Sequence, residues 1–121
     1  MKVYSTHFVL KGKASYKDLA PVFPQILEVL LDKIDQLPEE EEIMQMYITQ
    51  NMDDLLKDRK PEGYNRKGKI RLIFPIGSKE FYLKSYSKNT DLLTVSDKIS
   101  EILTGAGIKF ETRQDDRIDF E

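Results

Sequence analysis

The chain has no cysteine and a single histidine among its 121 residues. Without cysteine there is no disulfide framework, no thiolate zinc site and no cysteine nucleophile. One histidine, His7, is too few for a typical zinc site. The lack of thiols is compatible with a reducing compartment, so we expect a cytoplasmic protein.

Long apolar runs and an excess of one charge are also missing. No stretch approaches the ~20 apolar residues of a membrane span. Ser5, Thr6 and His7 interrupt the N-terminal stretch, unlike the apolar core of a signal peptide, and we expect no membrane partner. The 19 basic and 21 acidic residues leave a net charge of −2, which gives no global indication of nucleic acid or an anionic surface.

Recognised catalytic motifs are absent from the sequence. It contains no Walker loop, no Gly-x-Ser-x-Gly elbow and no dinucleotide fingerprint. His7 lies in a predicted strand, and its sequence context identifies no neighbour that would orient it as a general base. We therefore predict a sheet histidine without a catalytic role, no catalytic residue, no metal ligand and no cofactor, and we favour binding over catalysis.

The apolar periodicity predicts one α+β domain over residues 1–121. The elements expected in chain order are a strand at 2–10, a helix beginning near Ser15 and most regular over 24–37, a helix at 39–60, strands at 69–76 and 80–86, a helix from about 90 to 105, and a terminal strand or a hairpin turning at Asp115-Asp116. Apart from the extra helix, this order is the ferredoxin-like (split β-α-β) plan, with helices on one face of an antiparallel sheet. That plan hosts many unrelated functions, so it does not indicate an activity.

One segment of this plan is ambiguous. Met44, Ile48 and Met52 repeat at helical spacing, which favours a helix over 43–49. Short apolar runs of this kind also form strands. The choice decides which apolar side chains remain exposed.

Charge is unevenly distributed along the chain. Residues 32–56 hold one basic and eight acidic residues, a net charge of −7, whereas residues 57–88 hold ten basic and three acidic residues, a net charge of +7. The four glutamates at 39–42 and the bases at 57–60 lie at opposite ends of a predicted helix. Both groups suit the helix dipole, by roughly 0.3–1 kcal/mol per charge. The helix dipole does not account for the bases further along.

The hairpin at 64–88 combines those bases with tyrosines. Strand alternation places Ile70, Leu72, Phe74 and Ile76 on one face, opposite Phe81 and Leu83. The candidate binding residues are Arg66, Lys67, Lys69, Arg71, Tyr82, Lys84 and Tyr86. Tyrosines among cations on an open sheet face stack bases and hold phosphates. An ordinary half-exposed sheet carries the same pattern, and KEFYLKSY lacks the glycine-containing motif of RNA-recognition domains.

Two acidic pairs offer a third kind of site. Asp115-Asp116 and Asp53-Asp54 are carboxylate pairs of the type that hold Mg²⁺ for phosphodiester cleavage. Aspartate is also favoured in turns, and a hairpin turn explains Asp115-Asp116 equally well.

The sequence therefore favours a small binding domain, a protein-protein interaction module or a regulator or inhibitor. Its segregated charges suit steered association with a protein partner. The expected contact surface is the helix that begins at 39–42, with Met46 exposed, or the basic hairpin. Nucleic-acid binding by the hairpin is the alternative, and a metal-dependent phosphodiesterase comes third. A phage or mobile-element protein fits this profile, and the sequence leaves homo-oligomer formation open.

Overall fold

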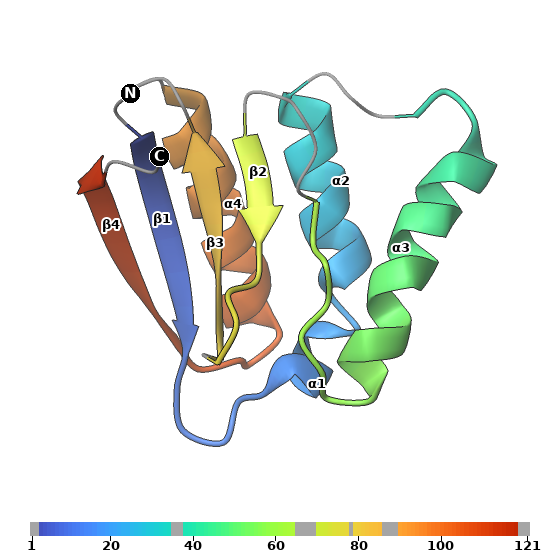
Figure 1. The fold of residues 1–121 in the computed structure, drawn as a ribbon, viewed down its shortest axis with the longest axis horizontal. Helices are drawn as coiled ribbons and strands as arrows, with labels where there is room; N and C mark the ends of the chain where they lie inside the picture. The colour runs from blue at the N-terminus through green and yellow to red at the C-terminus, as the bar shows by residue number, and fades with distance from the viewer. Residues whose placement is uncertain (1–2, 35–37, 65–69, 78, 86–89, 119–121) are drawn as a thin grey trace.

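The structure is a computed structural model that describes residues 3–34, 38–64, 70–77, 79–85 and 90–118. The described part is an α+β architecture with a four-stranded antiparallel sheet and helices against one face (Figure 1). In chain order the elements are β1 (Val3–Leu10), α1 (Tyr16–Leu19), α2 (Phe23–Lys33), α3 (Glu41–Leu56), β2 (Ile70–Ile73), β3 (Glu80–Ser85), α4 (Thr90–Gly105) and β4 (Phe110–Ile118).

The strands lie in the order β2-β3-β1-β4, and each pair of neighbours is antiparallel. β1 and β3 form the centre of the sheet. His7 is opposite Tyr82 in this pair, and Phe8 is opposite Phe81. Successive side chains on a strand point to opposite faces, so this register sends the two phenylalanines to one face and His7 with Tyr82 to the other.

The core lies between the sheet and the helices α2 and α4. Phe8 and Phe81 stack there with ring centroids 4.9 Å apart. Removing each large apolar side chain from water stabilises the fold by about 1.5–3 kcal/mol. The helices contribute buried residues at helical spacing, which are Phe23, Ile26, Leu27, Leu30 and Leu31 on α2 and Leu92, Val95, Ile99 and Leu103 on α4.

The predicted first helix is divided into α1 and α2. Asp18 accepts a hydrogen bond from the Ser15 backbone N–H at 2.9 Å, so the helix start predicted at Ser15 is confirmed. Pro21 lies in the turn between the two helices, where no helical N–H is needed. Pro24 lies in the first turn of α2, a position that tolerates the missing donor.

The ambiguous segment 43–49 is helical and lies within α3. Asn51 anchors the C-terminal half of this helix. Its Nδ2 donates to Tyr47 O at 2.9 Å and to Gly63 O at 3.3 Å, and its Oδ1 accepts from Gly63 N at 2.7 Å. Tyr64, the residue after Gly63, exchanges two backbone hydrogen bonds with Leu72 of β2, at 2.8 and 2.9 Å. The segment after α3 is therefore held between α3 and the sheet.

The predicted turn at Asp115-Asp116 is wrong, because β4 is one strand through both residues. It pairs with β1 along its length, and this ladder outweighs the local preference of aspartate for turns. Ser5 pairs with Asp115 and Val3 pairs with Ile118, so β4 holds one more residue than β1 there. The aspartate pair that the sequence pattern assigned to a turn therefore lies at this β-bulge.

The predicted inward position of Ile76 is also wrong. Ile70, Leu72 and Phe74 are buried as expected, but Ile76 is 91% exposed. β2 ends at Ile73, and Gly77 with φ +82° turns the chain beyond it. Alternation therefore stops before Ile76. Residues 69, 78 and 86, which belong to the predicted strands and turn, lie outside the described residues.

Candidate binding surfaces

The face of the sheet opposite the helices carries polar and charged side chains. Arg71 and Ile73 come from β2, whereas Tyr82 and Lys84 come from β3. The register places Arg71 opposite Lys84 and Ile73 opposite Tyr82. The structure therefore brings Arg71, Tyr82 and Lys84 together on one face, half-buried. The other candidate residues of the hairpin, Arg66, Lys67, Lys69 and Tyr86, lie outside the described residues.

A polar network occupies the middle of this open face. Ser5 Oγ lies 3.0 Å from His7 Nε2, and His7 Nδ1 lies 3.0 Å from Glu80 Oε2. The His7 ring stacks on Tyr82 with centroids 4.7 Å apart. Because a carboxylate only accepts, the proton in this contact lies on His7 Nδ1, which donates to Glu80. In the tautomer with its proton on Nδ1, Nε2 accepts from the Ser5 hydroxyl. Strands β1 and β3 are thus joined by side chains as well as by their ladder.

The order hydroxyl, imidazole, carboxylate resembles that of a nucleophile, its base and the group that orients the base. The rest of the geometry does not suit acyl transfer. Ser5 is only 2% exposed and lies on the central strand between Lys84 and Asp115 of the neighbouring strands. A substrate carbonyl cannot approach its Oγ in this conformation. The network satisfies buried polar groups, which are costly to leave without partners.

Charges of both signs surround this network. Arg113 on β4 approaches the same Glu80 carboxylate oxygen at 3.8 Å. Burial raises the pKa of Tyr16 above its ordinary value of 10.0, and the nearby carboxylates of Glu80 and Asp58 add to the effect. The Tyr16 phenol is therefore neutral at physiological pH. The open face has cations at Arg71, Lys84 and Arg113, but it is not uniformly basic.

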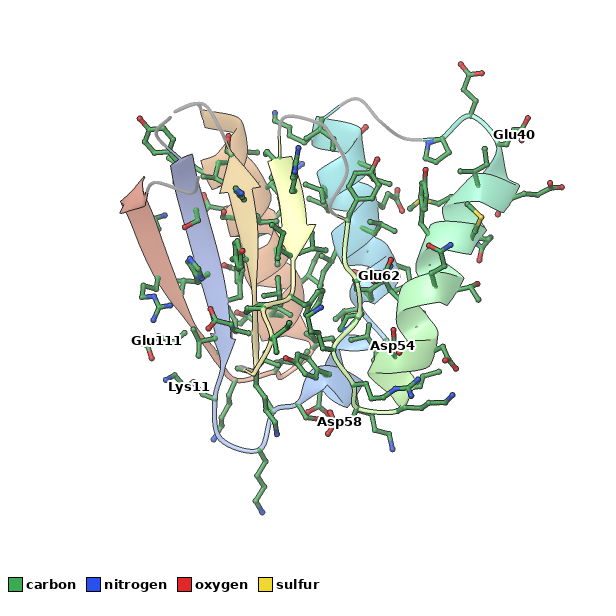
Figure 2. The ribbon with its side chains drawn as sticks, in the orientation of Figure 1. Lys11, Glu40, Asp54, Asp58, Glu62 and Glu111 are labelled. Carbon is green, nitrogen blue, oxygen red and sulfur yellow. The ribbon has the colours of Figure 1, made fainter. Side chains whose placement is uncertain are left out.

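A second surface lies on the N-terminal half of α3. All the fully buried residues of this helix, Asn51 and Leu55, belong to its C-terminal half. Ile43 and Met46 are 37% and 45% exposed, so the predicted exposure of Met46 is confirmed. The glutamates at 39–42 are exposed beside them, and Glu40 lies at the outer end of the helix (Figure 2).

A depression adjoins this helix surface. It has a volume of about 440 Å³ and lies between α3 and the segment 60–64, where Glu62 is visible in Figure 2. Tyr47 and Tyr64 line it and meet edge to face, with ring centroids 5.6 Å apart. Gln50, Asn51, Lys60, Glu62 and Gly63 complete its lining. Tyr47 follows Ile43 by one helical turn, so Ile43 lies on the same side of α3 as this aromatic wall. We call Ile43, Met46 and this depression the α3 surface.

The sequence analysis missed the partners of His7. Ser5 and His7 are two residues apart on one strand, so they share a face, and this signal was available in the sequence. Glu80 is 73 positions away from His7, and its contact depends on the pairing of β1 with β3. The orienting neighbour that the sequence context could not identify for His7 is therefore Glu80, and the burial of His7 agrees with a structural role.

No family model, curated protein or solved structure matches the chain. Within the residues that the structure describes, no helix is both long and apolar enough to cross a membrane. The same part of the chain contains no group of three or more metal-ligating side chains of the His, Cys, Asp and Glu types. The side chains of Asp115 and Asp116 are outside that search.

Proposed function

We propose that the protein is a binding domain that docks a protein partner on the α3 surface. The observation that carries this proposal is the incomplete packing of α3. A 16-residue helix normally buries a continuous apolar stripe, yet its first turns leave Ile43 and Met46 exposed. Isolated exposed apolar residues are ordinary, but here two of them lie on the helix that forms one wall of a depression, and its lining includes Tyr47 and Tyr64.

The chemistry of the surface indicates the chemistry of the partner. Four exposed glutamates at 39–42 border the apolar residues, and three of them line a second, open depression with Gln45. Opposite charges at the rim steer association, and a buried apolar contact supplies most of the affinity. The partner is therefore a protein segment with lysine or arginine next to a large apolar side chain. That side chain would pack on Ile43 and Met46 and reach the depression beside Tyr47.

The test is selection of a random peptide library on the immobilised protein. Enriched peptides should combine basic residues with Leu, Phe or Trp, and their affinity should fall with added salt. Met46→Lys should weaken binding at least tenfold, because it places a cation where the partner presents cations and removes apolar contact. Its stability should stay within about 0.5 kcal/mol of the wild type, since the residue is exposed.

Leu93→Lys is the matched control, because Leu93 is similarly exposed, at 49%, but lies on α4. It should leave peptide binding unchanged. Peptides that bind Met46→Lys as well as the wild type, or a library that yields no charge or apolar preference, would contradict the proposal.

One observation favours a second function, the binding of single-stranded nucleic acid to the open sheet face. The stacked pair of His7 and Tyr82 lies at the centre of that face, and Arg71 and Lys84 pair across the adjoining strands. Aromatic rings beside cations suit base stacking and phosphate contacts. Glu80 on the same face opposes this function by repelling phosphates.

The second function predicts micromolar oligonucleotide binding that weakens steeply between about 50 and 200 mM salt. Fluorescence anisotropy of labelled single-stranded DNA and RNA would measure it. Lys84→Ala should reduce both the affinity and the salt slope, whereas Lys98→Ala on α4 should change neither. Absence of binding at the lower salt concentration would exclude this function. The phosphodiesterase alternative depends on Asp115 and Asp116, and no observation on the described side chains favours it.

We also propose that the fold follows the ferredoxin-like plan with α3 as an inserted helix. The strand order β2-β3-β1-β4 and the antiparallel pairing of all neighbours support this assignment. The position of α2 and α4 behind the sheet supports it as well (Figure 1). On this view α3 is an addition to the scaffold, which agrees with a role in binding rather than in packing.

A further inference from the structure

Three lysines converge on an open depression at the end of the sheet where β1 finishes and β4 begins. The depression has a volume of about 800 Å³ and lies between the loop after β1, helix α1 and the loop after α4. Its lining consists of Gly12, Lys13, Ala14, Lys17, Asp18, Pro21, Ala106, Gly107, Ile108 and Lys109. Lys13 and Lys17 are far from Lys109 in the sequence, so tertiary structure alone assembles this lysine pocket.

The two loops that contribute to the lysine pocket are fixed by backbone hydrogen bonds. Lys11 N donates to Lys109 O at 3.0 Å and joins the loops to each other. Ala14 N donates to Lys11 O at 3.1 Å within the first loop, around Gly12 with φ +60°. Gly107, with φ +74°, closes the second loop at the end of α4. The walls therefore have a defined shape without a ligand, which lowers the entropic cost of binding.

The carboxylates around the lysine pocket have other partners. Asp18 accepts a hydrogen bond from the Ser15 backbone, and Asp58 accepts one from the Lys17 backbone N–H at 3.2 Å. Glu111 pairs with Lys11 at 3.2 Å, and the two lie side by side in Figure 2. Among the described residues, no ion pair involves the ammonium groups of Lys13, Lys17 or Lys109. The lining has three ammonium groups, on Lys13, Lys17 and Lys109, against the single carboxylate of Asp18, so the pocket has an excess of positive charge.

The C-terminal end of α4, which borders the pocket, carries negative partial charge that would oppose an anion. Three carbonyls of its last turn already accept hydrogen bonds. Ile102 O accepts from Ala106 N, Leu103 O from Ile108 N and Thr104 O from Gly107 N, each at 3.1 Å. These bonds reduce the exposure of the carbonyl oxygens to a ligand.

We propose that the lysine pocket binds the phosphate groups of a small organic polyphosphate. Lysine is a common phosphate ligand and acts as a mobile point charge, so three lysines around one depression suit a chain of phosphates. Ala14, Pro21 and Ile108 supply apolar contact for the organic part of the ligand. The volume lies within the range of small-molecule sites, about 300–1,000 Å³. This site is independent of the proposed protein-binding function of the α3 surface.

The test is a titration of the full chain with inorganic tripolyphosphate, ATP and adenosine, followed by amide chemical shifts in nuclear magnetic resonance. Tripolyphosphate and ATP should bind with sub-millimolar affinity and shift amides at 12–15 and 106–109. ATP should bind more tightly, and adenosine should not bind measurably. Lys17→Ala and Lys109→Ala should each weaken binding about tenfold, as expected for a charged hydrogen bond.

Lys98→Ala removes the same charge from an exposed position on α4 outside the pocket and should leave the affinity unchanged. No shifts with millimolar tripolyphosphate would overturn the proposal, as would equal losses in Lys98→Ala and Lys109→Ala. A single-stranded oligonucleotide that binds the same lysines more tightly than ATP would assign the pocket to nucleic acid and overturn the small-molecule class.

Discussion

Gly63 shows how one residue without a side chain determines the path of the chain between α3 and the sheet. Its φ is +76°, and a Cβ atom there would lie 2.4 Å from the carbonyl oxygen of Leu72. Asn51 binds the N–H and the C=O of the same residue. The amide side chain thus takes the place of a neighbouring strand, and the close approach to β2 admits only glycine.

Gly63→Ala should therefore be more destabilising than Gly77→Ala. Both glycines have positive φ, but a Cβ on Gly77 meets nothing within 4 Å. Gly77→Ala should lower the free energy of unfolding by about 1–2 kcal/mol, the cost of the left-handed conformation. Gly63→Ala should lower the free energy of unfolding by at least about 2 kcal/mol more than Gly77→Ala does, because the new Cβ can fit only if the backbone shifts away from Leu72. Urea denaturation followed by circular dichroism measures both, and equal losses would contradict the steric explanation.

The network at His7 gives a second prediction for single residues. Glu80→Ala should lower the free energy of unfolding by about 1–3 kcal/mol, because it leaves a buried imidazole N–H without its acceptor. Glu111→Ala is the control, since it breaks an exposed pair with Lys11 and should cost at most about 0.5–1 kcal/mol. The side chains of Glu80 and Glu111 are 14% and 67% exposed. A larger loss in Glu111→Ala would show that the network is not stabilising.

At the scale of elements, α3 differs from α2 and α4 in how it is held. The 11-residue α2 buries five apolar side chains, whereas the 16-residue α3 buries only Asn51 and Leu55. Met44, Ile48 and Met52 pack against the core but remain partly exposed. Because this amphipathic pattern is weak, the sequence alone did not decide whether residues 43–49 form a helix or a strand. A helix held mainly at one end can adjust when a partner binds.

Hydrogen exchange should resolve the two halves of α3. Amides of residues 45–48 should exchange considerably faster than those of residues 52–55, because local opening of the first turns breaks few buried contacts. Amides of β1 that pair with β3 should be the slowest in the protein. The measurement is native-state exchange at several denaturant concentrations. Uniform protection along α3 would mean that the helix opens only with the whole fold.

At the scale of the whole molecule, the fold redistributes charge that the chain holds in blocks. The acidic block at 39–42 remains at one end of α3. By contrast, the lysine pocket collects Lys13, Lys17 and Lys109 from two stretches that are far apart in the sequence. Counting charged residues along the sequence therefore identifies the acidic surface at 39–42 but not the lysine pocket. Steering by these fields affects association rates rather than the choice of fold.

Unfolding should be a single cooperative transition. One apolar cluster includes buried residues from every described helix and from β1, β2 and β3, so the elements share one core. Urea titrations followed by circular dichroism and by tyrosine fluorescence should coincide, with an m value of about 1–3 kcal/mol/M. Separate transitions for the two probes would show that α3 and the sheet unfold independently.

Much of the α+β architecture follows from the periodicity of apolar residues. The alternation in β1 places Phe8 and Leu10 in the core and His7 on the other face. Leu92, Val95 and Ile99 recur at helical spacing, and all three are buried on α4. The terminal turn at Asp115-Asp116 was wrong because strand pairing overrode a local preference. Local patterns succeed where burial of one face dominates and fail where a distant strand supplies the hydrogen bonds.

By itself, the sequence determined the type and approximate position of most elements and the acidic start of α3. Only the tertiary structure decided which distant residues meet. Glu80 reaches His7 because β1 pairs with β3 in one register, and Lys109 joins Lys13 because two loops bond at the end of the sheet. Periodicity is a local property of the chain, whereas these contacts depend on strand order and register. Those are set by the packing of the core as a whole.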